Sequence, residues 1–244
     1  MADPVVNELG QSIGAEVAGW SPRPAPPDTP MTGCRVRVER LDADRHTADL
    51  HAANLADEPG TWTYLPYGPF ADALDYAAWV RASAACRDPL FHAIVDLESG
   101  RAMGVAALMR IDQGNGVIEV GHIKFGAALA RSSKATEALF LLMRRAFDEL
   151  GYRRLEWKCD ALNVPSRRAA DRFGFTFEGI FRQAAIVRGR NRDTAWYAIV
   201  DREWPALRGA FERWLDPANF AADGQQRTRL ADLIADARRT AARR

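Results

Sequence analysis

A short polar cluster stands where a loop gives way to an amphipathic helix. Residues 131–134 read Arg-Ser-Ser-Lys, and apolar residues then repeat at helical spacing over 135–150, before a stop at Gly151. The start of a helix has unpaired backbone N–H groups and the positive end of the helix dipole, so it can bind a pyrophosphate. The alternative is an ordinary capped helix, with Ser132 or Ser133 as its N-cap.

A carboxylate lies on the strand that precedes this helix. Residues 117–125 are predicted as a strand, and period-2 alternation puts Glu119 on one face with Ile123 and Phe125. A carboxylate on such a face needs a partner or a task, and general-base catalysis is one such task. An edge-exposed or salt-bridged Glu119 is the alternative, because a bulge would reverse its face. His122 should point the opposite way and is the second candidate.

The surrounding pattern gives the elements that must position these residues. Strands are predicted over 34–41, 90–96, 102–111, 117–125, 153–160, 175–187 and 194–200, and helices over 42–54, 72–85, 135–150, 165–173 and 204–215. The order β-α-α-β-β-β-α-β-α-β-β indicates an α+β fold, with a mixed, mostly antiparallel central sheet flanked by helices.

The ends of the chain differ in composition from its middle. Residues 1–30 include the proline-rich stretch 22–27 and are expected to form a flexible lead. Residues 31–216 would form the domain. Residues 217–244 are expected to be a helical basic tail, either packed or solvated, or else docking a partner.

Composition excludes several classes of protein. The 244 residues are 48% hydrophobic and 27% charged, which suits one globular core, and the net charge of +1 makes nucleic acid an unlikely partner. The start lacks a signal peptide and no apolar run could span a membrane, so a cytoplasmic location is expected. Cys34, Cys86 and Cys159 form neither a disulfide framework nor a zinc site, so no metal is expected.

An ordered series of motifs resembles one enzyme family. The quoted stretches are Ala135-Thr136-Glu137-Ala138, Leu155-Glu156-Trp157, Asn163-Val164-Pro165-Ser166, Arg172-Phe173-Gly174-Phe175, Glu178-Gly179 and Arg182. This series is similar to that of the GCN5-related (GNAT) N-acetyltransferases, in the ribosomal-protein acetyltransferase-like branch, over about Met31 to Leu215. The chain departs from the phosphate-loop pattern [Q/R]-x-x-G-x-[G/A], with Ala130 and Ser133 at its first two marked positions. The tyrosine acid of many relatives is replaced by Ala170.

The resemblance implies transfer of an acetyl or other short acyl group from acyl-CoA to an amine, either a protein N-terminus or a small molecule. Glu119 would be the base and Ser166 the partner of the leaving thiolate, although a first-turn serine that bonds the backbone is the alternative. A non-catalytic acyl-CoA-binding module is the second hypothesis, and a homodimer is possible for such a protein. The residues implied to bind the cofactor are Ile123, Phe125, Arg131, Ser132, Ser133, Lys134, Ala135, Thr136, Asn163 and Arg168.

An aromatic loop over 62–70 completes the prediction. In the family this region helps to form the acceptor site, so Trp62 and Tyr64 are assigned to the substrate. The alternative is a loop whose rings pin it to the core. Arg168 has a comparable alternative, a solvated charge.

Overall fold

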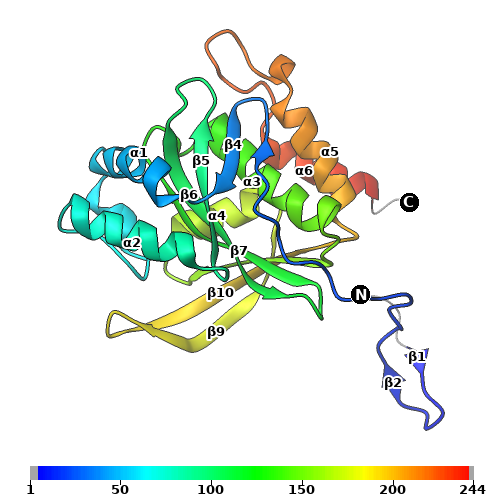
Figure 1. The fold of residues 1–244 in the computed structure, drawn as a ribbon. Coiled ribbons are helices and arrows are strands. Elements are labelled where there is room, and N and C mark those ends of the chain that lie inside the picture. The colour runs from blue at the N-terminus through cyan, green and yellow to red at the C-terminus, as the bar shows by residue number, and fades with distance from the viewer. Residues whose placement is uncertain (1–4, 242–244) are drawn as a thin grey trace.

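An eight-stranded sheet forms the centre of the molecule in the computed structural model, which describes residues 5–241, with Pro59 described by its backbone (Figure 1). The strands lie in the spatial order β3 (Met31–Thr32), β4 (Val36–Arg40), β5 (Leu90–Asp96), β6 (Ala102–Asp112), β7 (Val117–Phe125), β8 (Arg154–Asp160), β10 (Arg190–Val200) and β9 (Thr176–Val187). All neighbouring pairs are antiparallel except β7 and β8. The predicted fold class is confirmed.

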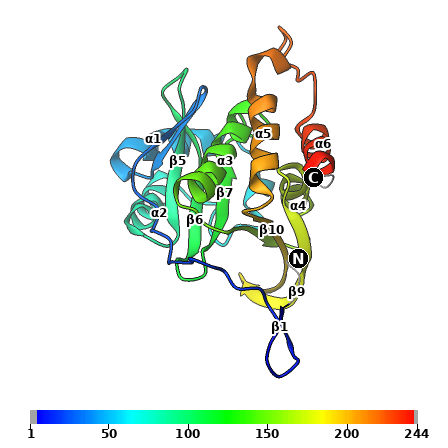
Figure 2. The same cartoon turned by 90° about the vertical axis from the view of Figure 1, so that its right-hand side faces the viewer.

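Helices cover both faces of this sheet (Figure 2). They are α1 (Ala43–Leu55), α2 (Ala73–Ala85), α3 (Ser133–Arg144), α4 (Val164–Arg172), α5 (Trp204–Leu215) and α6 (Leu230–Ala241). One apolar core lies between the sheet and α1 and α2, and a larger one lies between the sheet and α3, α5 and α6. Asp42 and Asp72 cap α1 and α2 by accepting backbone N–H groups, as aspartate at an N-cap does.

Helix α3 is fixed to the sheet by one buried carboxylate. Glu137 is 4% exposed and accepts the backbone N–H groups of Cys34, Arg35 and Val36 at 3.0, 2.7 and 2.9 Å. Its carboxylate needs these charge-assisted bonds, because an unpaired buried charge is costly. The first turn of α3 is therefore held at a set position beside β4. The α-helix ends at Arg144, and residues Arg145–Glu149 continue as a π-helical turn.

Part of the predicted flexible lead, residues 1–30, is packed against the folded body. Residues 20–29 lie along the body as a strap, because several of their groups are bonded to it. The Trp20 indole donates to the Gly114 carbonyl at 2.8 Å, and the Tyr152 hydroxyl donates to the Pro24 carbonyl at 3.1 Å. The boundary of the packed chain thus lies before residue 30.

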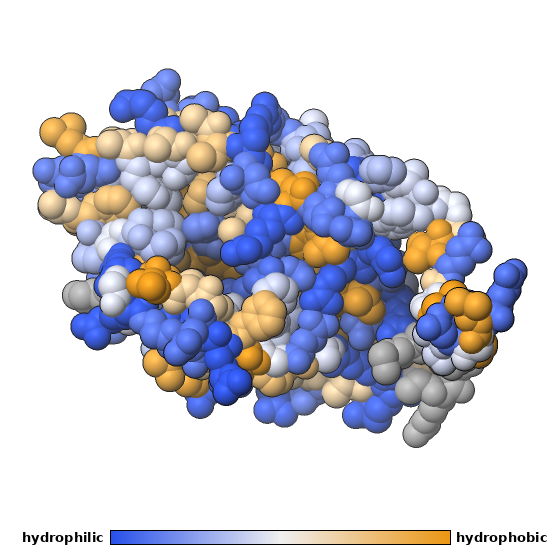
Figure 3. All heavy atoms as spheres, turned by 90° about the horizontal axis from the view of Figure 1, so that it is seen from below, coloured by the Kyte–Doolittle hydropathy of each residue, from blue (hydrophilic) through white to orange (hydrophobic). Residues whose placement is uncertain are grey.

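Ahead of the strap, β1 (Val5–Val6) and β2 (Ser12–Ile13) form a small hairpin that projects from the body. Seen from below, apolar side chains of this hairpin and of the β9–β10 ribbon lie at the surface among polar ones (Figure 3). At the other end of the chain, α6 packs on α5, and Leu230 and Ile234 of α6 belong to the larger core. Among the described residues, no helix has the length and apolar character needed to cross a membrane.

Candidate active site

The two parallel strands part where the predicted site lies. β7 pairs with β8 only from Val117 to Glu119, opposite Arg154 to Glu156, although β7 continues to Phe125 and β8 to Asp160. Beyond Glu119 the side of β7 that faces β8 has no strand partner there. The parting of the two strands leaves backbone groups of β7 open to a ligand.

A bulge in β7 changes which side chains share a face. Gly121 pairs with Ala107 and Lys124 with Val105, so His122 and Ile123 together oppose one residue of β6. His122 adopts φ +49° at this bulge. The prediction that Glu119 shares its face with Ile123 and Phe125 is therefore wrong, because the extra residue puts Lys124 on the Glu119 side.

Because of the same bulge, the predicted orientation of His122, opposite to Glu119, is also wrong. Its ring lies 5.0 Å from Phe91 and 5.6 Å from Tyr67, on the α1–α2 side of the sheet that Glu119 also faces. Burial, followed by the charges of Arg192 and Arg110, lowers the pKa of His122. His122 also lines the cavity described below, and its neutral imidazole can accept a proton, so it stays the second candidate for the base.

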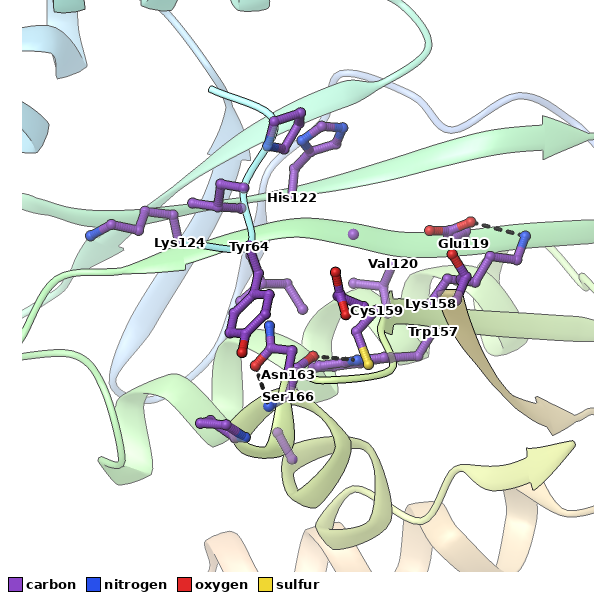
Figure 4. A pocket seen from close by; sticks show the side chains of 18 of the residues that line it. Tyr64, Glu119, Val120, His122, Lys124, Trp157, Lys158, Cys159, Asn163 and Ser166 are labelled. Atoms are coloured by element: carbon purple, nitrogen blue, oxygen red, sulfur yellow. Dashed lines mark hydrogen bonds and ion pairs between the residues drawn. The ribbon is translucent and has the colours of Figure 1, made fainter. Parts of the chain in front are cut away.

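A cavity of about 930 Å³ occupies the gap between β7 and β8 (Figure 4). Its walls come from β7, β8, α4, the loop 58–66 and the β9–β10 ribbon. Figure 4 shows Glu119 beside Lys158 at one end, with Asn163 and Ser166 below Tyr64 at the other. The cavity thus joins the predicted base to the start of α4.

Glu119 lies in this cavity with its charge partly compensated. Its Oε2 lies 3.1 Å from Lys158 Nζ and 3.2 Å from Arg110 Nε, and Lys158 is shared with Glu156 at 2.5 Å. The Glu119 Oε2 atom is buried and has no hydrogen bond of good geometry among the described residues. Burial raises the pKa of Glu119, and the charge of Lys158 opposes that rise. A carboxylate with a raised pKa that faces a cavity is suited to accept a proton.

The first turn of α3 offers two free amides. Ser132 is the N-cap, and its Oγ accepts the Ala135 N–H at 3.1 Å, while the Thr136 N–H donates to the Ser132 carbonyl at 3.3 Å. Over residues 5–241, no protein acceptor is found for the N–H groups of Ser133 and Lys134. The backbone N–H groups of Ala135 and Thr136, both predicted to bind the cofactor, are not free, because each already donates to Ser132.

Two charged residues of this loop behave differently from each other. Lys134 is paired with Asp96 at 2.8 Å and with Glu98 at 3.1 Å, which raises its pKa and directs its ammonium group toward carboxylates. Arg131 is exposed, with φ +60°. Of the two predicted cationic contacts, Arg131 has the freer side chain.

The start of α4 carries the predicted amide and hydroxyl. Asn163 caps the helix through Oδ1, which accepts the Ser166 N–H at 3.1 Å, and its side-chain NH2 group is left for a ligand. The Ser166 Oγ accepts the Trp157 indole N–H at 3.0 Å and still has its own proton to donate. Both residues line the cavity. Arg168 is exposed on the same helix and lies outside the cavity lining.

The two residues assigned to the acceptor are placed differently from each other. Tyr64 lines the cavity and donates its hydroxyl to the Leu162 carbonyl at 3.1 Å. Trp62 is 7% exposed, lies outside the lining, and packs edge-on against Phe70 with Lys124 over its ring. Trp62 therefore fits the alternative interpretation, in which its ring holds the loop against the core. The cis Gly68–Pro69 turn lies against its indole.

Sequence reasoning missed several residues of the cavity, among them Lys158, Arg192 and Trp196. Lys158 had a signal, because Glu156, Lys158 and Asp160 alternate along β8 as a polar stripe. Arg192 and Trp196 had none, since only the tertiary structure brings β10 over the gap.

A protein-family model described as an acetyltransferase (GNAT) domain matches residues 35–176, which include β4 to β8 and the cavity residues of β7 and α4. The chain belongs to the GNAT acetyltransferase family. The resemblance drawn from its motifs is confirmed. As a GNAT protein it is an acyl-CoA-dependent N-acyltransferase.

Relatives of this GNAT protein extend the match over nearly the whole fold. The chain is 26% identical over 150 residues to p20, an uncharacterized N-acetyltransferase of Bacillus licheniformis, covering 60% of this chain and 84% of p20. A GCN5-related N-acetyltransferase structure from Brucella melitensis is 47% identical with a TM-score of 0.88, covering 90% of this chain and 100% of that one. A probable acetyltransferase (GNAT family) from Chromobacterium violaceum ATCC 12472 is 40% identical with a TM-score of 0.74, covering 84% and 100%.

Proposed function

We propose that this GNAT protein transfers an acetyl or other short acyl group by direct attack of an amine on the thioester of acyl-CoA. The observation that carries the proposal is the parting of β7 and β8 around a cavity that holds Glu119. The acceptor amine would lie toward Glu119, and the thioester would lie along the open edge of β7, near Ile123 and Phe125.

The free amides at the start of α3 support a diphosphate site. The N–H groups of Ser133 and Lys134 have no protein acceptor in the described chain and stand at the positive end of the helix dipole. Exposed Arg131 adds a positive charge beside them. The Asn163 side-chain NH2 group, at the cavity wall, would donate to an amide carbonyl of the pantetheine arm.

Starting from an alkylammonium group, the nitrogen must lose two protons and the sulfur must gain one. An alkylammonium group has a pKa of about 10.4, so a base must take its proton before or during attack. Glu119 takes that proton and passes it to solvent. The nitrogen then forms a bond to the thioester carbon, the carbon–sulfur bond breaks, and Glu119 takes the second proton from the nitrogen. A backbone N–H on the open edge of β7 would stabilise the negative charge that develops on the carbonyl oxygen.

We assign protonation of the leaving thiolate to the hydroxyl of Ser166. Its hydroxyl keeps a proton to donate, because the Trp157 indole already occupies one of its lone pairs as a donor. Ala170, buried at 0% exposure in the larger core, cannot supply a proton. Ser166 regains its proton from solvent in the cavity.

The nature of the acceptor and the donor belongs to this proposal. Either a protein N-terminus or a small molecule could supply the amine, with Tyr64 at the wall of its site. A cytoplasmic location and a homodimer stay predictions.

Release of free thiol from a panel of acyl-CoAs and amines tests the proposal. We expect thiol release that depends on both the amine and the acyl-CoA. Tight binding of acetyl-CoA in calorimetry, with no thiol release for any amine tested, would contradict transfer and would point to a binding module.

A further inference from the structure

The cavity contains four cationic side chains, and three of them have acidic partners. Lys124 pairs with Asp57, and Lys158 and Arg110 both pair with Glu119. Arg192 also lines the cavity, but over residues 5–241 it has no carboxylate within ion-pair distance and no hydrogen bond. Its Nε is buried without an acceptor.

A second donor without an acceptor stands on the same strand. The Trp196 indole Nε1 is buried and makes no hydrogen bond within the described chain. Trp196 lines the cavity as well, and Lys158 Nζ lies 3.8 Å from the centre of its ring. Two buried donors on β10 therefore face one cavity with no protein oxygen to receive them, which is unusual because buried polar groups are nearly always paired.

Arg192 lies on the cavity wall beyond the end of β8. Thr194 pairs with Asp160, the last residue of β8, so Arg192 lies just beyond the end of that strand, over the gap between β7 and β8. Its charge reaches both walls, since it lowers the pKa of His122 on β7 and opposes the rise that burial gives the Cys159 thiol on β8. Phe181, Ala184 and Ala185 of the neighbouring strand complete an apolar surround.

An anionic ligand in the cavity would supply the acceptor that each of these donors lacks. A half-buried guanidinium without a counter-ion is unfavourable, and its planar N–H groups match the two oxygens of a carboxylate. Glu119 lies on the opposite strand, so an anion at Arg192 and an ammonium group toward Glu119 could belong to one molecule.

We propose that the acceptor is an amine that also carries a carboxylate, and that Arg192 binds this carboxylate together with the indole N–H of Trp196. The inference rests on the proposed acyl transfer and names its substrate class. A free α-amino acid has this chemistry, and so does a peptide N-terminus followed by an acidic side chain.

The test compares each acidic amine with its neutral amide. Thiol release from acetyl-CoA is measured for amino acids and their carboxamides, and for peptides that begin Ser-Asp or Ser-Asn. We expect kcat/KM for the acidic member to exceed that for its amide by about 10- to 100-fold, the effect of a charge-assisted bidentate pair. A preference confined to the free amino acids would identify them as the acceptor, and a preference confined to the peptides would identify a peptide N-terminus.

Two variants and one control sharpen the comparison. Arg192→Gln should bring the acidic-to-amide ratio close to 1 through a higher KM, with rates for amides changed less than about threefold. Trp196→Phe keeps the ring beneath Lys158 and should lower the ratio by a smaller factor, about threefold to tenfold. Arg190→Gln, an exposed arginine on the same strand, should leave the ratio unchanged.

The outcomes separate this inference from the transfer reaction. Equal rates for acids and amides, or a ratio that Arg192→Gln leaves intact, would overturn the carboxylate site while transfer itself stands. If no amine releases thiol, calorimetry with N-acetyl amino acids still decides the matter. Binding that Arg192→Gln weakens at least tenfold would support the site without the reaction, and binding that it leaves unchanged would overturn the site.

Discussion

The carboxylate of Glu119 lies 3.1 Å from the ammonium group of Lys158, and both side chains are only 6% exposed. Lys158 is shared with Glu156, so the pair is not a closed ion pair but part of a buried row of charges on β7 and β8. Such an arrangement keeps a carboxylate available in an apolar cavity, with its pKa raised by burial and restrained by the nearby cation.

Glu119→Gln should lower kcat by about 10²-fold or more, because the amide cannot take the amine proton. The dissociation constant for acetyl-CoA, measured by calorimetry, should change little, since none of residues 131–136 lines the cavity that holds Glu119. Glu212→Gln, at an exposed position of α5, is the matched control and should behave as the parent chain. Full turnover in Glu119→Gln would remove this residue from the base role.

The pH profile should have an acidic limb set by Glu119. Because burial raises its pKa above 4.5, the carboxyl stays protonated to a higher pH than an exposed glutamate, and kcat should fall as the pH drops through that raised value. Lys158→Met removes the charge that favours ionisation, so the limb should move to higher pH. A limb that moves the other way, or that persists in Glu119→Gln, would refute the assignment.

Ser133→Pro should weaken acyl-CoA binding about tenfold by removing one free N–H from the first turn of α3. The helix should tolerate the change, because proline suits the first helical position and Ser132 is already extended, at φ −98° and ψ 168°. Ser133→Ala keeps the N–H and should bind like the parent chain. Equal affinities for the two variants would show that the diphosphate is bound elsewhere.

Ser166→Ala should lower kcat by about 10- to 100-fold if its hydroxyl protonates the thiolate. The change also leaves the Trp157 indole without an acceptor, at a cost of about 1–3 kcal/mol in stability. Trp157→Phe removes that donor while keeping Ser166, so it separates the two effects. Urea unfolding and turnover are measured on both, and equal losses of kcat would favour a structural role for Ser166.

Most of the elements around the site could be predicted from local pattern. Helix caps at Asp42 and Asp72, the amphipathic stripe of α3 and the alternation of the strands are properties of short segments, so the sequence is sufficient for them. The ordered motif series from Ala135 to Arg182 likewise predicted the family. These features depend on spacing along one chain.

The side of the sheet to which each β7 side chain points could not be predicted from the sequence. A single extra residue at His122 moved Lys124 to the side of Glu119 and turned His122 there too, because a bulge depends on pairing with β6. Likewise, Trp62 packs under the Gly68–Pro69 turn instead of lining the cavity, which only the folded loop reveals.

What the sequence by itself determined is the set of elements, their order and the family to which they belong, because hydrophobic period and turn residues act locally. What only the tertiary structure decided is which polar groups meet. Lys158 reaches Glu119 across the parting strands, and Arg192 and Trp196 come over the gap from β10, more than 70 positions along the chain from Glu119. Distances between remote residues follow from packing of the whole sheet, which no short segment of sequence contains.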